Sequence, residues 1–369
     1  MTIVKYRPIL VFTCIITLVV LFFQMKHTFE KRKVRKSENI FKDENEELSP
    51  QQLGNFVIAW STVLPVRNSD PNSDISLIND VNRGFKNRPI VTLFTSFKTD
   101  YTVNSEKVLV YNNTLYNWQM FRPHVQLIVF TKETSATDKV NLTDWNLFPI
   151  LNYSESGIPT IKEMYVQAKE LYNTYWHGYF NSDILLTDDF LETLEYVSSV
   201  SDNFPNASIL IIGRRINVLN VTSEEVRKIN GIRESARSRG SLYEIDAEDY
   251  FITNRFFLWN KIPVFVIGRA GYDNWIVGHA RCDLGTIVID ATETLTAVHQ
   301  TTSKGGNKEG FAHVDKNYNF ELMQALKLPK RFLQGLTTCA EWRTFRTIKT
   351  SRIELVKRDD LHKNCKCKK

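Results

Sequence analysis

The sequence predicts an α/β domain in which a mostly parallel sheet is covered by helices on both faces. Unbroken apolar stretches at 90–95, 125–130 and 208–213 are typical of strands buried on both sides. Segments with helical spacing of apolar residues lie between them, as expected when strands and helices alternate around one sheet. Ligands bind such sheets at the carboxyl ends of the strands, so polar residues that directly follow an apolar strand are the first candidates for a site.

The elements are expected to alternate regularly along the chain. Thr160 starts a helix whose apolar face consists of Ile161, Met164, Tyr165 and Ala168. Strands are recognised by apolar runs bounded by polar residues. The expected order is strand 90–95, helix 107–120, strands 125–130 and 147–151, helix 160–172, strand 179–186 with a polar corner, helix 188–200, and strands 208–213, 249–253, 265–267 and 287–292, with a helix that starts near residue 273.

The two ends of the chain differ from this domain in charge and composition. Residues 1–36 contain eight basic residues and one acidic residue around an apolar segment, which at about 18 residues just reaches a bilayer span. No small-residue cleavage site follows, so we expect an uncleaved transmembrane signal anchor. The polar, acidic residues 37–86 are expected to form a stem. Residues 87–336 are the expected folded domain, and residues 337–369 a basic tail.

Two signals bear on membrane orientation, and they disagree. Lys5 and Arg7 precede the apolar segment but six basic residues follow it closely, which by the positive-inside rule favours a cytosolic domain. Five N-x-S/T sequons favour the secretory lumen instead. They begin at Asn112, Asn141, Asn152, Asn206 and Asn220. Since large domains translocate largely regardless of charge, we expect a single-pass type II protein with a luminal domain.

Four cysteines follow the apolar segment and would meet an oxidising lumen. A disulfide between Cys282 and Cys339 is one pairing open to them, which leaves Cys365 and Cys367 for each other or for a partner. Spacing alone does not decide the connectivity. No spacing of Cys and His typical of a zinc site is present. Between its basic ends the chain carries more acidic than basic residues, so no nucleic-acid partner is expected.

The most informative stretch is a polar corner within an apolar run at 179–186. Asn181 and Asp183 interrupt the run, and a carboxylate placed where a buried strand opens can hold a divalent metal, which in turn holds a diphosphate. The alternative is a strand end capped by polar residues. Arg214 and Arg215 follow the strand 208–213, where guanidinium groups suit phosphate or carboxylate binding unless they only form surface ion pairs.

Three later segments carry further candidates. Asp249 begins a short strand, either as a site residue or as a strand cap. Asp273 lies near a helix start, where the backbone dipole favours an anion, and Arg269 between two glycines suits a pocket wall. His299 is expected to lie after the last strand, facing a glycine- and lysine-containing loop at 304–308. Neither a G-x-G-x-x-G motif nor a P-loop is present.

Together these segments resemble the GT-A-like nucleotide-diphospho-sugar transferases, and in particular a little-characterised group of them. The resemblance covers roughly residues 88–325. It consists of seven pieces in the family's order: G-x-P at 157–159, N-x-D-I-L at 181–185, I-G-R-R at 212–215, D-Y-F at 249–251, I-G-R-x-x-Y-D-N-W at 267–275, I-D-A-T at 289–292 and V-H-Q at 298–300.

The resemblance implies a role for each candidate. Asp183 is similar to the metal-binding aspartate of the family's D-x-D element, and His299 to a late histidine that completes the metal site. Asn181 departs from the pattern, because the family has a carboxylate there. Thr95 and Ser96, after the first strand, match the position of the base and ribose. The resemblance implies donor or phosphate contacts for Arg214 and Arg215, and a general base at Asp273, with Asp249 as the competing candidate, while Arg269 is a candidate donor-binding residue from its place between glycines.

The function implied is a glycosyltransferase of the endoplasmic reticulum or Golgi membrane. It would use a nucleotide-sugar donor with Mn²⁺ or Mg²⁺, and transfer the sugar to a hydroxyl of a glycan or glycoconjugate acceptor. Two alternatives remain open. A nucleotidyltransferase could use the same fold, although a luminal anchor argues against that chemistry. A catalytically inactive sugar- or nucleotide-binding or scaffold protein would explain Asn181.

Overall fold

The computed structural model describes residues 88–96, 105–131, 145–302 and 315–367, apart from the single residues 151, 156, 202, 229 and 360. The expected membrane anchor and the expected stem lie outside the described residues, as does the loop 304–308. None of the helices within the described ranges is long and apolar enough to cross a membrane.

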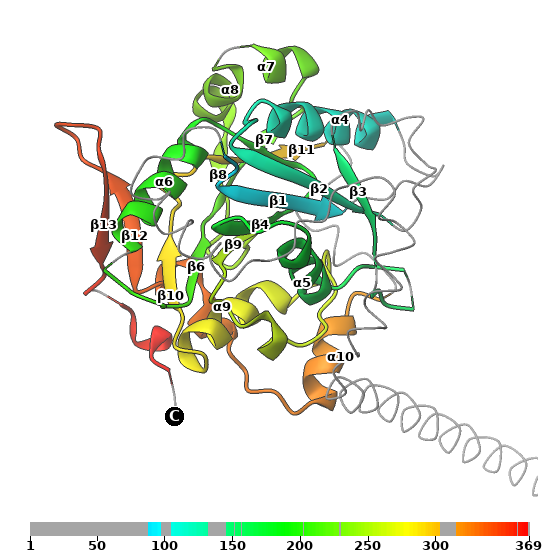
Figure 1. Ribbon diagram of the computed structural model, residues 1–369, viewed down its shortest axis with the longest axis vertical. Helices are drawn as coiled ribbons and strands as arrows, with labels where there is room; N and C mark the ends of the chain where they lie inside the picture. Colours follow the sequence, from blue (N-terminus) through cyan, green and yellow to red (C-terminus); the bar gives the residue numbers. More distant parts are fainter. Residues whose placement is uncertain are drawn as a thin grey trace, which may run out of the picture. The chain divides into compact units, whose positions relative to one another are not determined.

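A nine-stranded sheet forms the centre of the described domain (Figure 1). Its strands are arranged in the order β13-β12-β10-β6-β9-β4-β1-β2-β3. Most neighbours are parallel, as predicted, while β9 runs antiparallel to both β4 and β6, and β13 antiparallel to β12. The strands are β1 (Val91–Ser96), β2 (Val125–Thr131), β3 (Asn146–Pro149), β4 (Trp176–Phe180), β6 (Ile209–Ile212), β9 (Tyr250–Asn254), β10 (Ile287–Asp290), β12 (Trp342–Arg346) and β13 (Ile353–Lys357).

Helices cover both faces of this sheet because its strands are apolar on both sides. One buried cluster joins α4 and α6 to the sheet, and a second joins α5, α9 and α10 to the opposite face. Figure 1 shows α4 and α6 on one side and α5 and α9 on the other. The helices are α4 (Ser105–Gln119), α5 (Ile161–Leu171), α6 (Asp189–Ser201), α7 (Ser223–Arg227), α8 (Gly231–Arg239), α9 (Tyr272–Cys282) and α10 (Tyr318–Ala325).

A second, four-stranded sheet lies at the polar corner and was not predicted. Its order is β5-β11-β7-β8, with bounds Ile184–Leu186, Ala297–Thr301, Arg215–Leu219 and Ser241–Leu242. His299 therefore lies within a strand, and the expectation that it follows the last strand is wrong. Its segment is only five residues long, and it becomes a strand by pairing with β5 and β7, which are more than 75 residues away in sequence.

The antiparallel strand β9 brings its amino end to the edge where the parallel strands have their carboxyl ends. Phe180 of β4 pairs with Tyr250 of β9, and the backbone N–H of Asn181 donates to the carbonyl of Asp249 at 2.9 Å. Asp249 thus reaches the same edge as the corner at residues 181–183, although it precedes its strand rather than follows it.

The segment 265–267 is buried but is not a strand of either sheet, contrary to the prediction. Other groups satisfy its backbone instead. The side chain of Asn319 accepts from the N–H of Val266 and donates to its carbonyl, both at 3.0 Å, while Ile267 donates to the carbonyl of Pro159. An apolar run does not distinguish a buried strand from a buried loop whose polar groups are satisfied by a side chain.

The C-terminal residues, expected as a basic tail, belong to the fold. Strand β12 pairs in parallel with β10, and β13 completes this edge of the sheet (Figure 1). Arg358 forms an ion pair with Asp290 at 2.6 Å, which places one of the basic residues beside the strand end of β10. At least one positive charge of this segment therefore forms an ion pair within the domain.

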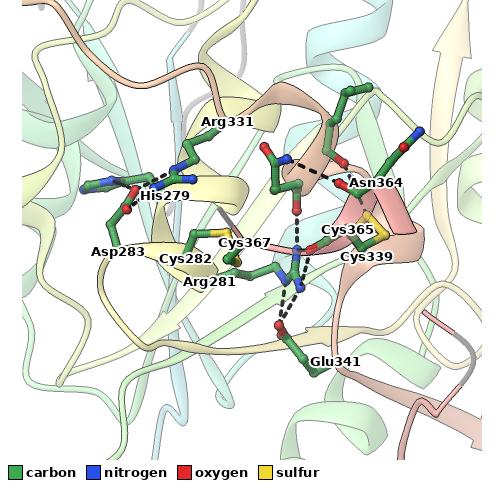
Figure 2. Close-up of a disulfide and its surroundings, with 12 residues drawn as sticks. His279, Arg281, Cys282, Asp283, Arg331, Cys339, Glu341, Asn364, Cys365 and Cys367 are labelled. Atoms are coloured by element: carbon green, nitrogen blue, oxygen red, sulfur yellow. Dashed lines mark hydrogen bonds and ion pairs between the residues drawn. A yellow bond between two sulfur atoms is a disulfide. The ribbon is translucent and has the colours of Figure 1, made fainter. Parts of the chain in front are cut away.

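Two disulfides attach the end of the chain, and their pairing differs from the one considered from sequence. They join Cys282 to Cys367 and Cys339 to Cys365 (Figure 2). The buried guanidinium of Arg281 lies between them, and donates to Glu341 at 2.6 Å and to the carbonyl oxygens of Gln334 and Cys365. The end of α9 and the last residues of the chain are thus cross-linked into one unit.

Candidate active site

The corner at residues 181–183 is a tight turn between two sheets. The N–H of Ile184 donates to the carbonyl of Asn181 at 3.1 Å, so the chain leaves β4 and enters β5 within three residues. On the far side, the N–H of Gln300 donates to the carbonyl of Asp183 at 3.0 Å. Both ends of the corner are thereby fixed by backbone hydrogen bonds, which holds the side chain of Asp183 at the carboxyl edge of the large sheet.

Asp183 and His299 lie together, as the resemblance implied. Antiparallel pairing of β5 and β11 places His299 opposite Ile184, and its Nε2 lies 3.2 Å from Oδ2 of Asp183. The imidazole is buried, whereas about a third of the Asp183 side chain (32%) is exposed. Burial favours the protonated form of Asp183, but the charge and hydrogen bond of His299, helped by Arg215, outweigh it and lower the pKa of Asp183.

Thr301 orients this histidine, and the sequence analysis did not select it. Nδ1 of His299 lies 2.9 Å from the hydroxyl oxygen of Thr301, two positions along the same strand and therefore on the same face. A hydrogen bond at one ring nitrogen fixes the ring and decides how the other nitrogen is used. The alternation of side chains along an apolar strand was the signal available for Thr301.

Asp183 and His299 together could be two ligands of a divalent cation whose remaining coordination positions are filled by other oxygens. Oδ1 of Asp183 is buried and has no hydrogen-bond partner within the described residues, so one acceptor is left for a ligand. Mg²⁺ is commonly held by one or two carboxylates together with substrate phosphates, and imidazole suits several transition metals. In the part of the chain that the structure describes, no group of three or more His, Cys, Asp or Glu side chains could hold a metal.

Arg215 and Asp249 form a buried ion pair beside this corner. Nη1 of Arg215 lies 2.6 Å from Oδ1 of Asp249, and the guanidinium also packs 4.2 Å from the ring centre of Tyr243. Asn181 donates through Nδ2 to the same Oδ1 at 2.7 Å. Burial raises the pKa of Asp249, while the charges of Arg215 and His299 oppose that rise.

The other two predicted arginines are held by different partners. Nε of Arg214 donates to the carbonyl oxygen of Tyr243 at 2.7 Å. Arg269 forms an ion pair with Asp315 at 2.6 Å. Of the three arginines chosen from sequence, Arg215 is therefore the one whose guanidinium lies against the carboxylate next to the corner.

The I-G-R-R motif has a steric basis at Gly213. A Cβ atom at this position would lie 2.1 Å from the hydroxyl oxygen of Tyr250, so only glycine allows the phenol to approach the end of β6. Tyr250 is fully buried, and its hydroxyl has no hydrogen-bond partner among the described residues. This hydroxyl is a further polar group at the same edge that the sequence analysis did not select.

Asp273 lies in the first turn of α9, close enough to Asp249 for the two charges to interact. Gly271 precedes the helix with φ of 92°, a left-handed conformation that lets the chain turn sharply into it. Burial is the main reason that the pKa of Asp273 is raised to about 7, and the nearby negative charge of Asp249 adds to it, against backbone N–H groups that favour the ionised form. Such a group changes protonation near neutral pH.

Glu248 is a second buried acid on this side, and it was not selected from sequence. Its two oxygens accept from Asn274 Nδ2 and Thr337 Oγ1, each at 3.0 Å. Burial, followed by the negative charge of Asp273, raises its pKa well above the usual range. Three acids within four residues, at 246, 248 and 249, were the signal in the sequence.

Thr95 and Ser96 end β1, which pairs with β4 in parallel. Thr95 is fully buried, and its hydroxyl has no hydrogen-bond partner within the described residues. Ser96 is partly exposed. Both residues therefore lie at the same edge of the sheet as the corner, and their contact with a base or ribose stays a prediction.

A scan against protein-family models found no match, and neither did a search of curated proteins. Among solved structures, the chain is similar to glucosyl-3-phosphoglycerate synthase from Mycobacterium tuberculosis in complex with Mn²⁺, UDP-glucose and phosphoglyceric acid, with 10% identity, coverage of 72% of this chain and 86% of that one, and a TM-score of 0.35.

Two further solved structures show a likeness of the same kind. S. aureus TarS (residues 1–349) in complex with UDP-GlcNAc has 13% identity, covers 67% and 70% of the two chains, and has a TM-score of 0.33. CMP:2-keto-3-deoxy-manno-octonic acid synthetase complexed with CTP has 8% identity, covers 64% and 99%, and has a TM-score of 0.31. The structures that this chain resembles thus include proteins solved with nucleotide sugars.

Proposed function

We propose that this domain is a nucleotide-sugar-dependent glycosyltransferase that transfers a sugar to a hydroxyl group. The observation that carries the proposal is a pair of carboxylates, Asp183 and Asp273, that each lie close enough to Asp249 to interact with its charge but have opposite electrostatic environments. Asp183 is kept ionised by His299, whereas Asp273 has a pKa raised to about 7. Pairs of acids whose environments push their pKa values apart are typical of sites that combine charge stabilisation with proton transfer.

Asp183 and His299 would hold a divalent cation, Mn²⁺ or Mg²⁺. When bound, the cation would offset the negative charge that develops on the leaving diphosphate. Thr301 keeps the imidazole oriented, so Nε2 faces the same space as Asp183. Because the described residues supply these two groups and no third one, binding of the cation and of the nucleotide should depend on one another.

Asp273 would act as the general base for the acceptor hydroxyl. Its carboxylate receives backbone N–H groups at the start of α9, which fix its position. A base with a pKa near the working pH is best suited to accept a proton during transfer. Burial, followed by the negative charge of Asp273, also raises the pKa of Glu248 well above its usual range.

The alternative is a binding protein without catalytic activity, and Asn181 is the observation that favours it. A screen for donor hydrolysis with a panel of UDP-, GDP- and CMP-sugars, with and without Mn²⁺, decides between the two. Release of nucleotide from one donor, dependent on Asp183, is the expected result. Thermal stabilisation by a nucleotide without hydrolysis or transfer would favour the binding protein, and no stabilisation by any nucleotide would overturn both.

We also propose a type II membrane topology with a luminal domain. Four paired cysteines suit an oxidising compartment, and two of the sequon asparagines, Asn206 and Asn220, are exposed. Endoglycosidase treatment of the protein expressed in animal cells should increase its gel mobility. An unchanged band from membrane-inserted protein would place the domain in the cytosol.

A further inference from the structure

Asn181 occupies a position where the resembled family has a carboxylate, and both ends of its amide already form hydrogen bonds within the chain. Oδ1 accepts from the hydroxyl of Tyr179 at 2.8 Å, and Nδ2 donates to Oδ1 of Asp249 at 2.7 Å. In this orientation of the amide, a donor faces an acceptor at both ends. The flipped orientation would place the amide oxygen of Asn181 against Oδ1 of Asp249. Asn181 is therefore committed to holding its neighbour.

A carboxylate at position 181 would not fit this arrangement. It would face Asp249 at the distance of a hydrogen bond, 2.7 Å, with no proton between the two oxygens. Among the described residues, Arg215 is the cation that lies on that oxygen of Asp249, at 2.6 Å. Two like charges at this distance in a buried site repel strongly. The amide at position 181 and the carboxylate at position 249 are thus complementary.

One carboxylate oxygen of Asp249 is held by hydrogen bonds from the chain, and the other has no donor among the described residues. Oδ1 receives both Asn181 and Arg215, whereas Oδ2 is buried and has no hydrogen-bond partner within the described residues. Only 7% of the side chain is exposed. Buried carboxylate oxygens are rarely left without a donor, so Oδ2 is oriented for a group that the described residues do not supply.

We propose that Asp249 provides the second carboxylate of the donor site, and that Asn181 is a positioning residue that holds it there. Oδ2 of Asp249 would accept a hydrogen bond from a hydroxyl of the sugar in the nucleotide sugar, a charge-assisted bond of the kind that carboxylates form with O–H groups. This inference rests on the proposed function. The carboxylate that the N-x-D triplet lacks is then supplied by Asp249, the residue that directly precedes strand β9.

The first test is Asn181→Asp, because two readings of Asn181 predict opposite results. If Asn181 were a weakened metal ligand, the carboxylate would tighten Mn²⁺-dependent nucleotide binding. A positioning residue predicts the reverse, with weaker binding and a melting temperature lower by several degrees, on the order of 5 °C. Binding of UDP, GDP and CMP with Mn²⁺ is measured by calorimetry, and melting without any ligand. Equal or higher melting temperature, or tighter binding, overturns the positioning role.

The second test compares Asp249→Asn with Asp246→Asn, an exposed acid on the same segment, as the matched control. The affinity of the bare nucleotide and of its sugar derivative are measured in each variant, using UDP with UDP-glucose and UDP-GlcNAc, and GDP with GDP-mannose. We expect Asp249→Asn to bind the bare nucleotide as tightly as the wild type does, and to bind the nucleotide sugar roughly 10- to 100-fold more weakly. The control variant should bind both ligands as the wild type does. Retention of that added affinity in Asp249→Asn overturns the assignment.

The two tests also separate this inference from the proposed function. If the wild-type protein binds no nucleotide, the proposed function fails, and the ligand-free melting of Asn181→Asp still decides the positioning role. If the wild-type protein binds nucleotide sugars and Asp249→Asn does so equally well, the proposed function stands and the inference about Asp249 is wrong.

Discussion

The two sides of the candidate site both contain carboxyl groups, but the neighbours of these groups differ in charge. On the corner side, Asp183 lies beside His299 and Asp249 beside Arg215. On the α9 side, Glu248 is held by the neutral groups of Asn274 and Thr337. The basic neighbours lower the pKa of Asp183 and oppose the rise that burial causes in that of Asp249, whereas burial and nearby negative charge raise those of Asp273 and Glu248.

This difference indicates a division of labour between the two sides. A carboxylate that stays ionised suits a cation, and a carboxyl group that titrates near neutral pH suits proton transfer. If the two sides have different roles, loss of an acid on the corner side should weaken nucleotide binding, and loss of an acid on the α9 side should slow transfer. Equal effects on both sides would contradict this division.

Asp273→Asn should have the largest effect, and it should act on transfer alone. An amide cannot accept the proton of the acceptor hydroxyl, so the transfer rate should fall by roughly 10² to 10⁴. Nucleotide affinity, measured by calorimetry, should stay unchanged because the corner is intact. Near-normal turnover would show that Asp273 only caps α9, and would return the role of base to Asp249.

Removal of the disulfides should destabilise the α9 side more than the corner. Paired alanine replacements at Cys282 and Cys367, and at Cys339 and Cys365, open loops with sequence separations of 85 and 26 residues. We expect losses of about 3 to 5 kcal/mol in the free energy of unfolding, larger for the longer loop. Denaturant unfolding with calorimetric nucleotide binding below the transition tests this, and a variant that loses nucleotide affinity before transfer would contradict the division.

Asp183→Ala and His299→Ala should each weaken Mn²⁺-dependent nucleotide binding, by about 10- to 100-fold. If they share one ion, the double variant should lose little more than either single one, because groups that act as a unit are not additive. Thr301→Val should reproduce part of the loss through the orientation of His299. Fully additive losses would indicate that His299 has only a structural role.

The last prediction concerns stability as a function of pH. Asp273 has a pKa of about 7 in the folded protein against its ordinary value of 3.8, so the folded state binds the proton more tightly. Stability from this group is complete below pH 4 and is lost as the pH rises to about 7. The melting temperature of Asp273→Asn relative to wild type should therefore rise between pH 4 and pH 7 and then level off. A constant difference would mean that Asp273 titrates normally.

Most helices and several strands could be predicted from the sequence, because their apolar patterns are local. The stretch around Val91, the helix after Thr160 and the strand that ends at Ile212 all lie where hydrophobic spacing places them. The failures share one cause. Strand β11, the loop at 265–267 and the disulfide pairs each depend on partners far away in sequence, such as Asn319 for the loop.

The sequence by itself determined that Asp183, Asp249, Asp273 and His299 each lie next to a buried element, since polar residues at the ends of apolar runs are a local signal. Only the tertiary structure decided which of them meet. Asn181 and Asp249 are 68 residues apart, and antiparallel insertion of β9 between β4 and β6 is what brings them together. Strand order and direction follow from packing of the whole chain, and the electrostatic environment of each acid depends on them.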